Sequence, residues 1–125
     1  MGKTTFENLE VYQLSEKLAD LIWEIVSNWD HFSKGTVGKQ LVESCDSISA
    51  NIAEGCGRFN YKDNGRFIKI SRGSLYETKS WLRRAYRRRL LTEADVDRLK
   101  PILDELLPKL NAYKRAIDKA AKDNN

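Results

Sequence analysis

Residues 60–90 read NYKDNGRFIKISRGSLYETKSWLRRAYRRRL, and this stretch decides the fold. Apolar and small side chains recur along it every three or four residues, which is the period of an α-helix. Asn60 is a favourable N-cap residue, and Asp63 stands at the third helical position. The segment predicts one helix from Asn60 to Leu90, about 45 Å long at 1.5 Å per residue. Its predicted inward face holds Phe67, Ser71, Leu75, Thr78, Leu82 and Ala85, flanked by Ile68, Tyr86 and Trp81.

The opposite arc of this predicted helix is basic. Residues 58–89 hold eleven Lys or Arg but only two acids, a net charge of +9, whereas the whole chain carries +4. The rest of the chain is therefore acidic. Such asymmetry is typical of a surface for a polyanion, or of one side of a charge-complementary protein contact. The candidate nucleic-acid-binding residues are Arg58, Lys62, Arg66, Lys69, Arg83, Arg84, Arg87 and Arg88, whereas Arg89 is expected to project near the apolar side.

A first helix is predicted from about Asn8 to Asn28. Its apolar arc spans roughly 200°, wider than the arc of about 100° that a single buried face requires. The extra width indicates a second buried contact, either inside the bundle or between subunits. Tyr12 and Trp23 are the candidate oligomer-interface residues, and the polar side of this helix is acidic. The predicted buried stripe comprises Val11, Leu14, Leu18, Ile22, Ile25 and Trp29.

A second helix is predicted from about Thr36 to Gly57, with one apolar face and one face of small residues that permits close packing. Residues 35–39 are interpreted as a turn into this helix, and His31 as an exposed loop residue. Gly55 and Gly57 suit a C-terminus closed by a residue in the left-handed conformation. The small face comprises Ser44, Ser47, Ala50 and Asn51, and the apolar face Leu41, Val42, Cys45, Ile48, Ile52 and Cys56.

A fourth helix is predicted from Thr92, which forms a capping-box-like pair with Asp95, to about residue 121. Pro101 and Pro108 lie seven residues apart, and so share a side opposite the leucine stripe. A proline on the solvent face bends a helix around its core, which favours one kinked helix. A break at Lys100 is the alternative. The stripe comprises Val96, Leu99, Leu103, Leu106, Leu110, Tyr113 and Ile117.

These four segments predict an all-α fold, an antiparallel up-down-up-down four-helix bundle that forms a single domain over residues 1–125. No apolar run approaches the roughly 20 residues of a membrane span, and residues 1–9 lack the apolar core of a signal peptide. We therefore expect a cytoplasmic protein with no membrane partner. Cys45 and Cys56 lie about 16 Å apart by helical rise, so they cannot form a disulfide with each other. They are interpreted as small buried side chains, with a redox role as the alternative.

Two blocks of the chain carry a family resemblance. Residues 47–58 read SISANIAEGCGR, and residues 66–77 read RFIKISRGSLYE. They resemble the signature S-I-P-A-N-I-A-E-G-x-G-R, then R-F-L-x-x-A-R-G-S-L-x-E, of the four-helix bundle proteins encoded in intervening sequences of 23S ribosomal RNA genes. The opening FENLEVY at residues 6–12 and Leu110-Asn111 also resemble that family. Ser49 stands where the family usually has proline, and residues 42–44 stand where a basic pair is common.

The resemblance implies a ring-like homopentamer of four-helix bundles whose biochemical role is not established. It also implies a distant relation to the accessory protein of diversity-generating retroelements, which binds nucleic acid and a reverse transcriptase. Asn51, Glu54 and Arg72 lie within the family signature. We interpret them as a structural set that ties two helices together through buried hydrogen bonds or an ion pair, with a functional role as the alternative.

No constellation of catalytic residues is recognisable, so we expect a protein that is not an enzyme and that has no metal and no cofactor. His31 has no carboxylate or cysteine at ligand spacing, and residues 35–39 lack the spacing of a phosphate-binding loop. Phe59 and Tyr61 are interpreted either as stacking platforms for unpaired bases or as staples of a helix start.

Three explanations remain for the basic arc: a solvated face with intramolecular partners, a contact with the acidic face of another subunit, and phosphate binding. We predict a homo-oligomer that binds nucleic acid, either RNA or DNA with RNA favoured, without strong sequence readout. The alternative is a structural or protein-interaction module, with a protein partner as yet unknown, whose charge pattern serves self-assembly only.

Overall fold

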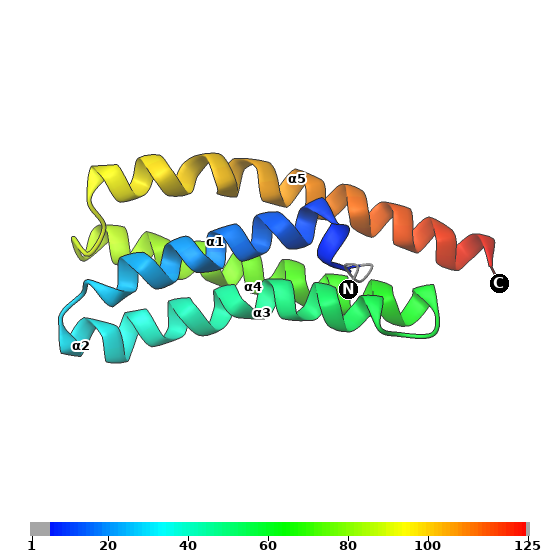
Figure 1. Ribbon diagram of the computed structural model, residues 1–125, viewed down its shortest axis with the longest axis horizontal. Helices are drawn as coiled ribbons and strands as arrows, with labels where there is room; N and C mark the ends of the chain where they lie inside the picture. Colours follow the sequence, from blue (N-terminus) through cyan, green and yellow to red (C-terminus); the bar gives the residue numbers. More distant parts are fainter. Residues whose placement is uncertain (1–5, 125) are drawn as a thin grey trace.

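The computed structural model describes residues 6–124 and consists of four long helices that lie side by side (Figure 1). No strand occurs in this range. Successive long helices are connected at alternate ends of the bundle (Figure 1). The elements in chain order are a 3₁₀ turn η1 (Phe6–Asn8), α1 (Glu10–Ser27), a short α2 (His31–Ser33), a π-helical turn η2 (Lys34–Gly38), α3 (Lys39–Cys56), α4 (Tyr61–Arg87) and α5 (Glu93–Asp123).

Helix α4 begins as predicted and ends three residues earlier. The Asn60 side chain accepts a hydrogen bond from the Asp63 amide at 2.8 Å, which satisfies one of the free amides at the helix start. At the other end, Arg89 adopts a left-handed conformation with a φ of 62°, and this turns the chain toward α5. The prediction that Arg89 projects near the apolar side is wrong, because its side chain is exposed beyond the helix end.

The segment before α3 differs most from the prediction. Asp30 caps a helical turn that starts at His31, and its carboxylate accepts hydrogen bonds from the Ser33 amide at 3.0 Å and the Ser33 hydroxyl at 2.7 Å. The chain then continues through η2 directly into α3, so the predicted turn at residues 35–39 and the predicted loop at His31 are wrong. A Cβ atom on Gly38 would lie 2.7 Å from Val26 Cγ1, so glycine permits this close approach to α1.

Helix α5 is continuous from Glu93 to Asp123 and passes through both prolines. Its N-terminus has the predicted capping box, in which Thr92 and Asp95 each accept a hydrogen bond from the backbone amide of the other at 3.0 Å. Pro101 and Pro108 are both exposed, so water can satisfy the carbonyls that lack an amide partner. The alternative of a break at Lys100 is wrong.

The core lies where the apolar faces of the four long helices meet. Helix α1 packs against α3 and α5, and α4 packs against the same two helices. Among the described residues the backbones of α1 and α4 do not approach each other, so the two helices occupy diagonal positions. The largest fully buried side chains are Leu18, Ile22, Leu41, Ile48, Ile52, Ile68, Leu75, Leu106 and Leu110.

Helices α3 and α4 meet along a row of small polar side chains, which we call the α3–α4 seam. It comprises the pairs Ser44–Thr78 and Ser47–Ser74, with hydroxyl oxygens 3.1 and 2.9 Å apart, and the Ser71 hydroxyl, which donates to the Ile48 carbonyl at 2.8 Å. Small residues on α3 were predicted to allow this close packing, and the hydrogen bonds confirm it.

Gly55 belongs to the same seam. A Cβ atom there would lie 2.4 Å from Asn64 Oδ1 and 3.1 Å from Phe67 Cβ, both on α4. Gly57 follows the helix with a φ of −81°, so the predicted left-handed closure of α3 is wrong. The glycine that the packing requires is Gly55, and the requirement is close approach between helices.

Candidate nucleic-acid interface

The predicted cations line the outer arc of α4. Lys62, Arg66, Lys69, Arg83, Arg84 and Arg87 belong to the helix and are exposed, and Arg58 and Arg88 lie exposed just before and just after it. Arg58 forms an ion pair with Glu54 at 2.7 Å, and Arg66 forms one with Asp63 at 3.1 Å. Within residues 6–124 no carboxylate forms an ion pair with any of the other six, which are Lys62, Lys69, Arg83, Arg84, Arg87 and Arg88.

Four of these cations gather at the C-terminal end of α4. Arg83, Arg84, Arg87 and Arg88, together with Ser80, line a hollow of about 370 Å³, which we call the arginine hollow. The Arg84 guanidinium lies 5.4 Å from the centre of the Trp81 ring, a cation–π contact that restrains it. Guanidinium groups present planar sets of N–H donors that match phosphate oxygens, so the hollow has the chemistry of an anion site.

The other end of α4 carries exposed aromatic side chains beside its cations. Phe59 is fully exposed and Tyr61 is 46% exposed, so Phe59 does not staple the helix start into the core. The ring that packs there is Phe67, which lies 4.5 Å from the Arg58 guanidinium. Phe59 and Tyr61 are therefore accessible to a partner.

In the described structure no hydrogen bond or ion pair joins the signature residues Asn51, Glu54 and Arg72 to one another. Asn51 Nδ2 donates to the Ser47 carbonyl and hydroxyl of its own helix, at 2.8 and 2.9 Å, and so supports the seam. Arg72 Nη1 donates to Asn111 Oδ1 at 3.3 Å and connects α4 to α5. Glu54 is exposed and pairs with Arg58 near the end of α3. A buried ion pair within this set is therefore absent from the described structure.

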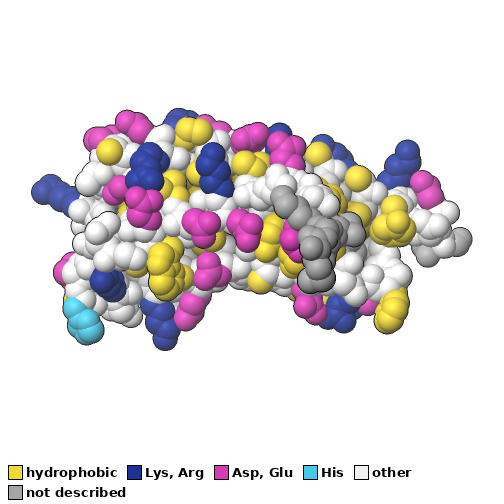
Figure 2. Space-filling view, viewed as in Figure 1, with side chains coloured by type: hydrophobic (Ala, Val, Ile, Leu, Met, Phe, Trp, Pro, Cys, Tyr) yellow, Lys and Arg dark blue, Asp and Glu magenta, His cyan; other side chains and the backbone are white. Residues whose placement is uncertain are grey.

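Two acidic side chains of helix α1 form ion pairs with cations on α5. Glu24 pairs with Arg98 at 2.8 Å, and Glu10 pairs with Lys109. Asp46 of α3 has its pKa raised, first by burial and then by the neighbouring charge of Asp20. Acidic side chains gather over α1 on the face shown in Figure 2, on the opposite side of the bundle from α4. Two of the four acids of α1 thus have cation partners on α5, whereas within residues 6–124 no carboxylate forms an ion pair with the arginines of the hollow.

The sequence segments that form the helices of the bundle also match a known protein family. The model of the family described as "23S rRNA-intervening sequence protein" matches residues 7–112, which include α1, α3, α4 and most of α5. The chain belongs to this family. No curated protein matches the chain.

The two cysteines of this 23S rRNA-intervening sequence protein are both free, as predicted. Cys45 is fully buried, and burial raises the pKa of its thiol to about 12. Cys56 is half-buried, and its Sγ lies 3.5 Å from the Tyr113 hydroxyl. Burial and this contact, in that order, raise the pKa of Tyr113 to about 12. The prediction of two buried cysteines therefore holds for Cys45, whereas Cys56 takes part in a polar contact with α5.

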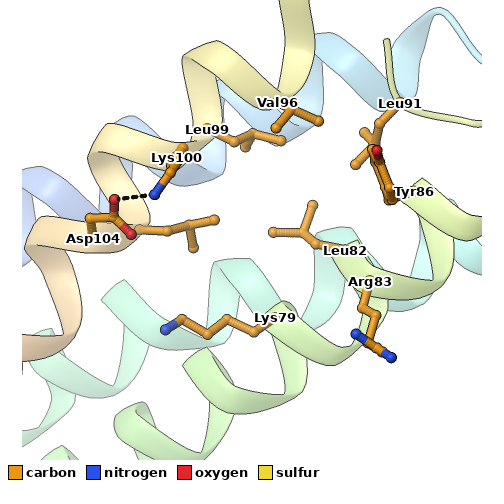
Figure 3. Close-up of a pocket in the computed structure, with 10 residues that line it drawn as sticks. Lys79, Leu82, Arg83, Tyr86, Leu91, Val96, Leu99, Lys100 and Asp104 are labelled. Atoms are coloured by element: carbon orange, nitrogen blue, oxygen red, sulfur yellow. Dashed lines mark hydrogen bonds and ion pairs between the residues drawn. The ribbon is translucent and has the colours of Figure 1, made fainter. Parts of the chain in front are cut away.

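A second feature of this 23S rRNA-intervening sequence protein lies beside the arginine hollow and was not predicted. An open hollow of about 430 Å³ separates the C-terminal half of α4 from the first turns of α5, and we call it the α4–α5 groove (Figure 3). Sequence reasoning assigned Leu82, Leu99 and Leu103 to core stripes and Tyr86 to a flank of the α4 stripe, so it gave no sign of an unfilled edge. The lining is mainly apolar: Leu82, Tyr86, Leu91, Val96, Leu99 and Leu103, with Lys79, Arg83, Lys100 and Asp104 at the rim.

No helix in the described part of the chain is both long enough and apolar enough to cross a bilayer. Within the same part, no three His, Cys, Asp or Glu side chains cluster as a metal site would require.

Proposed function

We propose that this protein is a non-enzymatic nucleic-acid-binding bundle that contacts phosphates through the basic arc of α4, with RNA favoured over DNA. The observation that carries the proposal is the arginine hollow. Four arginine side chains line it, and within the described residues none of them forms an ion pair with a carboxylate. Bringing four like charges together is unfavourable, and a polyanion relieves this repulsion.

The spacing of the arginines also supports the proposal. Arg83, Arg84 and Arg87 lie on consecutive turns of α4 and Arg88 follows its last residue, so the side chains project as a patch about one and a half turns long. Phosphates are present in every nucleotide, so such contacts give affinity and register without reading sequence. Lys62, Lys69 and the exposed aromatics at the start of α4 extend the same arc to its other end.

The test is a paired charge reversal. We expect the double variant Arg83→Glu and Arg87→Glu to abolish binding of a labelled mixed-sequence RNA, measured by fluorescence anisotropy. Its matched control is Arg115→Glu with Lys119→Glu, which changes the net charge equally on exposed positions of α5. Single losses from the hollow should reduce the slope of log affinity against log salt by about one unit each. Equal loss of binding in both double variants would contradict a site on α4.

A second candidate function is self-assembly, and the exposure of Trp23 favours it. Trp23 is 64% exposed at the edge of an apolar hollow lined by Val26, Gly38 and Val42. Tyr12 is less available, because its ring packs edge-on against Phe6 at 4.9 Å and its hydroxyl donates to Glu16. We propose a homopentamer in which Trp23 lies at the subunit interface, and we keep Tyr12 as a weaker candidate.

Light scattering of the wild type and of Trp23→Glu tests this second candidate. The exposed indole ring is a typical interface anchor and supports assembly, and the family resemblance supplies the expected mass of about five chains. The variant should have a lower mass with the same helix content, because Trp23 contributes little to the core. A monomeric wild type at micromolar concentration would contradict the assembly.

Three related proposals complete this assignment. Connections at alternate ends of the bundle support an antiparallel up-down-up-down course. The two free thiols support a reducing compartment, which in turn supports the cytoplasm. The helical-bundle architecture supports the distant relation to the accessory protein of diversity-generating retroelements.

A further inference from the structure

We propose that the α4–α5 groove receives one unpaired base of a single-stranded nucleic acid whose adjacent phosphates lie in the arginine hollow. This inference rests on the proposed function and deepens it, because it names the class of nucleic acid. It also assigns a role to a surface that the phosphate contacts leave unused.

The two sites are continuous through one residue. Arg83 lines both the arginine hollow and the groove, and its guanidinium points away from the groove (Figure 3), so a phosphate bound there lies on the other side of this side chain from the groove. In a nucleotide a single sugar joins the charged phosphate to the largely apolar base. The protein places a cationic site, the arginine hollow, next to an apolar site, the α4–α5 groove, in the same order. Figure 3 shows Arg83 and Tyr86 on neighbouring turns of α4, with Leu82 between α4 and α5.

The groove has the size and lining that a base requires. Its volume of about 430 Å³ lies in the range of small-molecule sites, which is about 300–1,000 Å³. Tyr86 is 52% exposed, so its ring is available for stacking, and the leucine and valine side chains opposite can cover the second face of a base. The polar edge of the base would meet the rim, where Lys79 has no carboxylate partner within residues 6–124 and Lys100 bonds Asp104 at 2.8 Å.

A single strand fits this arrangement and a duplex does not. Bases inside a duplex are stacked and paired, and only phosphates, sugars and groove edges face a protein. An unpaired base has a free π-face, and stacking on an aromatic side chain is tolerant of sequence. An acidic protein segment or a second copy of this chain is the competing occupant. The groove shares Arg83 with the arginine hollow, and this continuity favours a ligand in which charged and apolar groups alternate along one strand.

Two tyrosines on α4 provide a matched test. Tyr86 and Tyr76 are 52% and 55% exposed, but only Tyr86 lines the groove. We expect Tyr86→Ala to weaken binding of a single-stranded RNA by about tenfold, which corresponds to the loss of one stacked base. Binding of a duplex of the same sequence should not change. The Tyr76 ring lies 6.0 Å from Nζ of the rim residue Lys79 but outside the groove, so Tyr76→Ala should affect both affinities far less than Tyr86→Ala affects the single strand. Circular dichroism should show the same helix content in all variants.

A groove-filling variant gives an independent measurement. Leu103→Trp places a large ring in the groove, and Ala112→Trp adds the same ring at an exposed position of α5. Leu103→Trp should remove the preference of the wild type for the single strand over the duplex, whereas Ala112→Trp should retain it.

The outcomes separate the two levels of the proposal. Failure of the wild type to bind either RNA would overturn the proposed function. Equal affinity of the wild type for the single strand and the duplex, with no effect of Tyr86→Ala, would overturn this inference and leave phosphate binding on α4 intact. A lower oligomer mass for Tyr86→Ala by light scattering would also overturn it, because the groove would then hold a second copy of the chain.

Discussion

Helix α4 packs differently on its two sides. Toward α3 it forms the α3–α4 seam, in which serine, threonine and glycine bring the two backbones close together and hydrogen bonds cross the interface. Toward α5, at its C-terminal half, large apolar side chains leave the α4–α5 groove open. Apolar composition alone therefore does not close an interface in this bundle. Small side chains close it, because they let helices approach within hydrogen-bonding distance.

The two regions also differ in their polar groups. The seam buries Ser44, Ser71 and Thr78, and each of their hydroxyl groups has a hydrogen-bond partner. A satisfied buried hydroxyl contributes about 1 kcal/mol net, whereas an unsatisfied one is costly. The seam should therefore be sensitive to changes in size and polarity, whereas the groove should tolerate added volume.

The largest expected effect is from added bulk in the seam. Ser71→Leu inserts a large side chain at a fully buried position and removes the hydrogen bond to the Ile48 carbonyl. We expect a loss of about 3 kcal/mol or more in the free energy of unfolding, measured by urea denaturation. Val96→Leu adds a methylene group at the groove and should change it by less than about 0.5 kcal/mol. Similar losses in both variants would end the distinction between the two regions.

A smaller effect is expected from a single methyl group on a glycine. Gly55→Ala should destabilise the protein by about 2 kcal/mol, because the new Cβ would clash with Asn64 and Phe67. The control is Gly73→Ala within α4, where a Cβ meets nothing within 4 Å. There the higher helix propensity of alanine should stabilise the protein by about 1 kcal/mol. Thermal denaturation measures both variants. A lower melting temperature for Gly55→Ala and a higher one for Gly73→Ala would support the comparison, and changes of the same sign would contradict it.

The third prediction concerns alkaline pH. Cys45 follows the seam residue Ser44, and burial raises its thiol pKa from 9.0 to about 12. Above pH 9 the unfolded chain loses this proton while the folded chain keeps it, so stability should fall as the pH rises from 9 to 12. We expect a loss of about 1 kcal/mol between pH 9 and 10 in the wild type, and a smaller loss in Cys45→Ala. Identical pH profiles would show that the thiol is not desolvated.

The smallest effect is expected on the solvent side of α5. Pro108→Ala should leave stability unchanged or raise it slightly, because Pro108 is exposed and alanine restores a helical amide. Thermal denaturation measures the difference. A loss of more than about 2 kcal/mol would mean that Pro108 is required for the packing of α5.

The long elements of the fold were predictable because each carries local signals. Asn60 and Thr92 cap their helices as their sequence contexts indicate, and the exposed prolines lie opposite the buried stripe. The region before α3 was not predictable from propensity. Gly35 and Gly38 weaken a helix in isolation, but Gly38 is required for close packing against Val26, and this tertiary contact outweighs its low propensity.

The candidate site was predictable in composition and only partly in arrangement. The pairs Glu54–Arg58 and Asp63–Arg66 follow from helical spacing of three or four residues. Within the described residues Arg83 and Arg87 form no ion pair with a carboxylate. This depends on which side chains of α3 and α5 lie nearby, and only the packed structure shows these neighbours. The α4–α5 groove could not be predicted for the same reason. A stripe of leucines in the sequence does not indicate whether a neighbouring helix covers the whole stripe.

The diagonal placement of α1 and α4 has a consequence for how the molecule approaches a charged partner. Acidic side chains on one corner of the bundle and basic side chains on the opposite corner give the protein an electric dipole moment across its width. In the field of a polyanion this moment exerts a torque that turns α4 toward the strand before contact. If α4 makes the proposed phosphate contacts, the acidic corner faces away from the strand, and we expect the outer surface of the complex to carry the acidic side chains of α1.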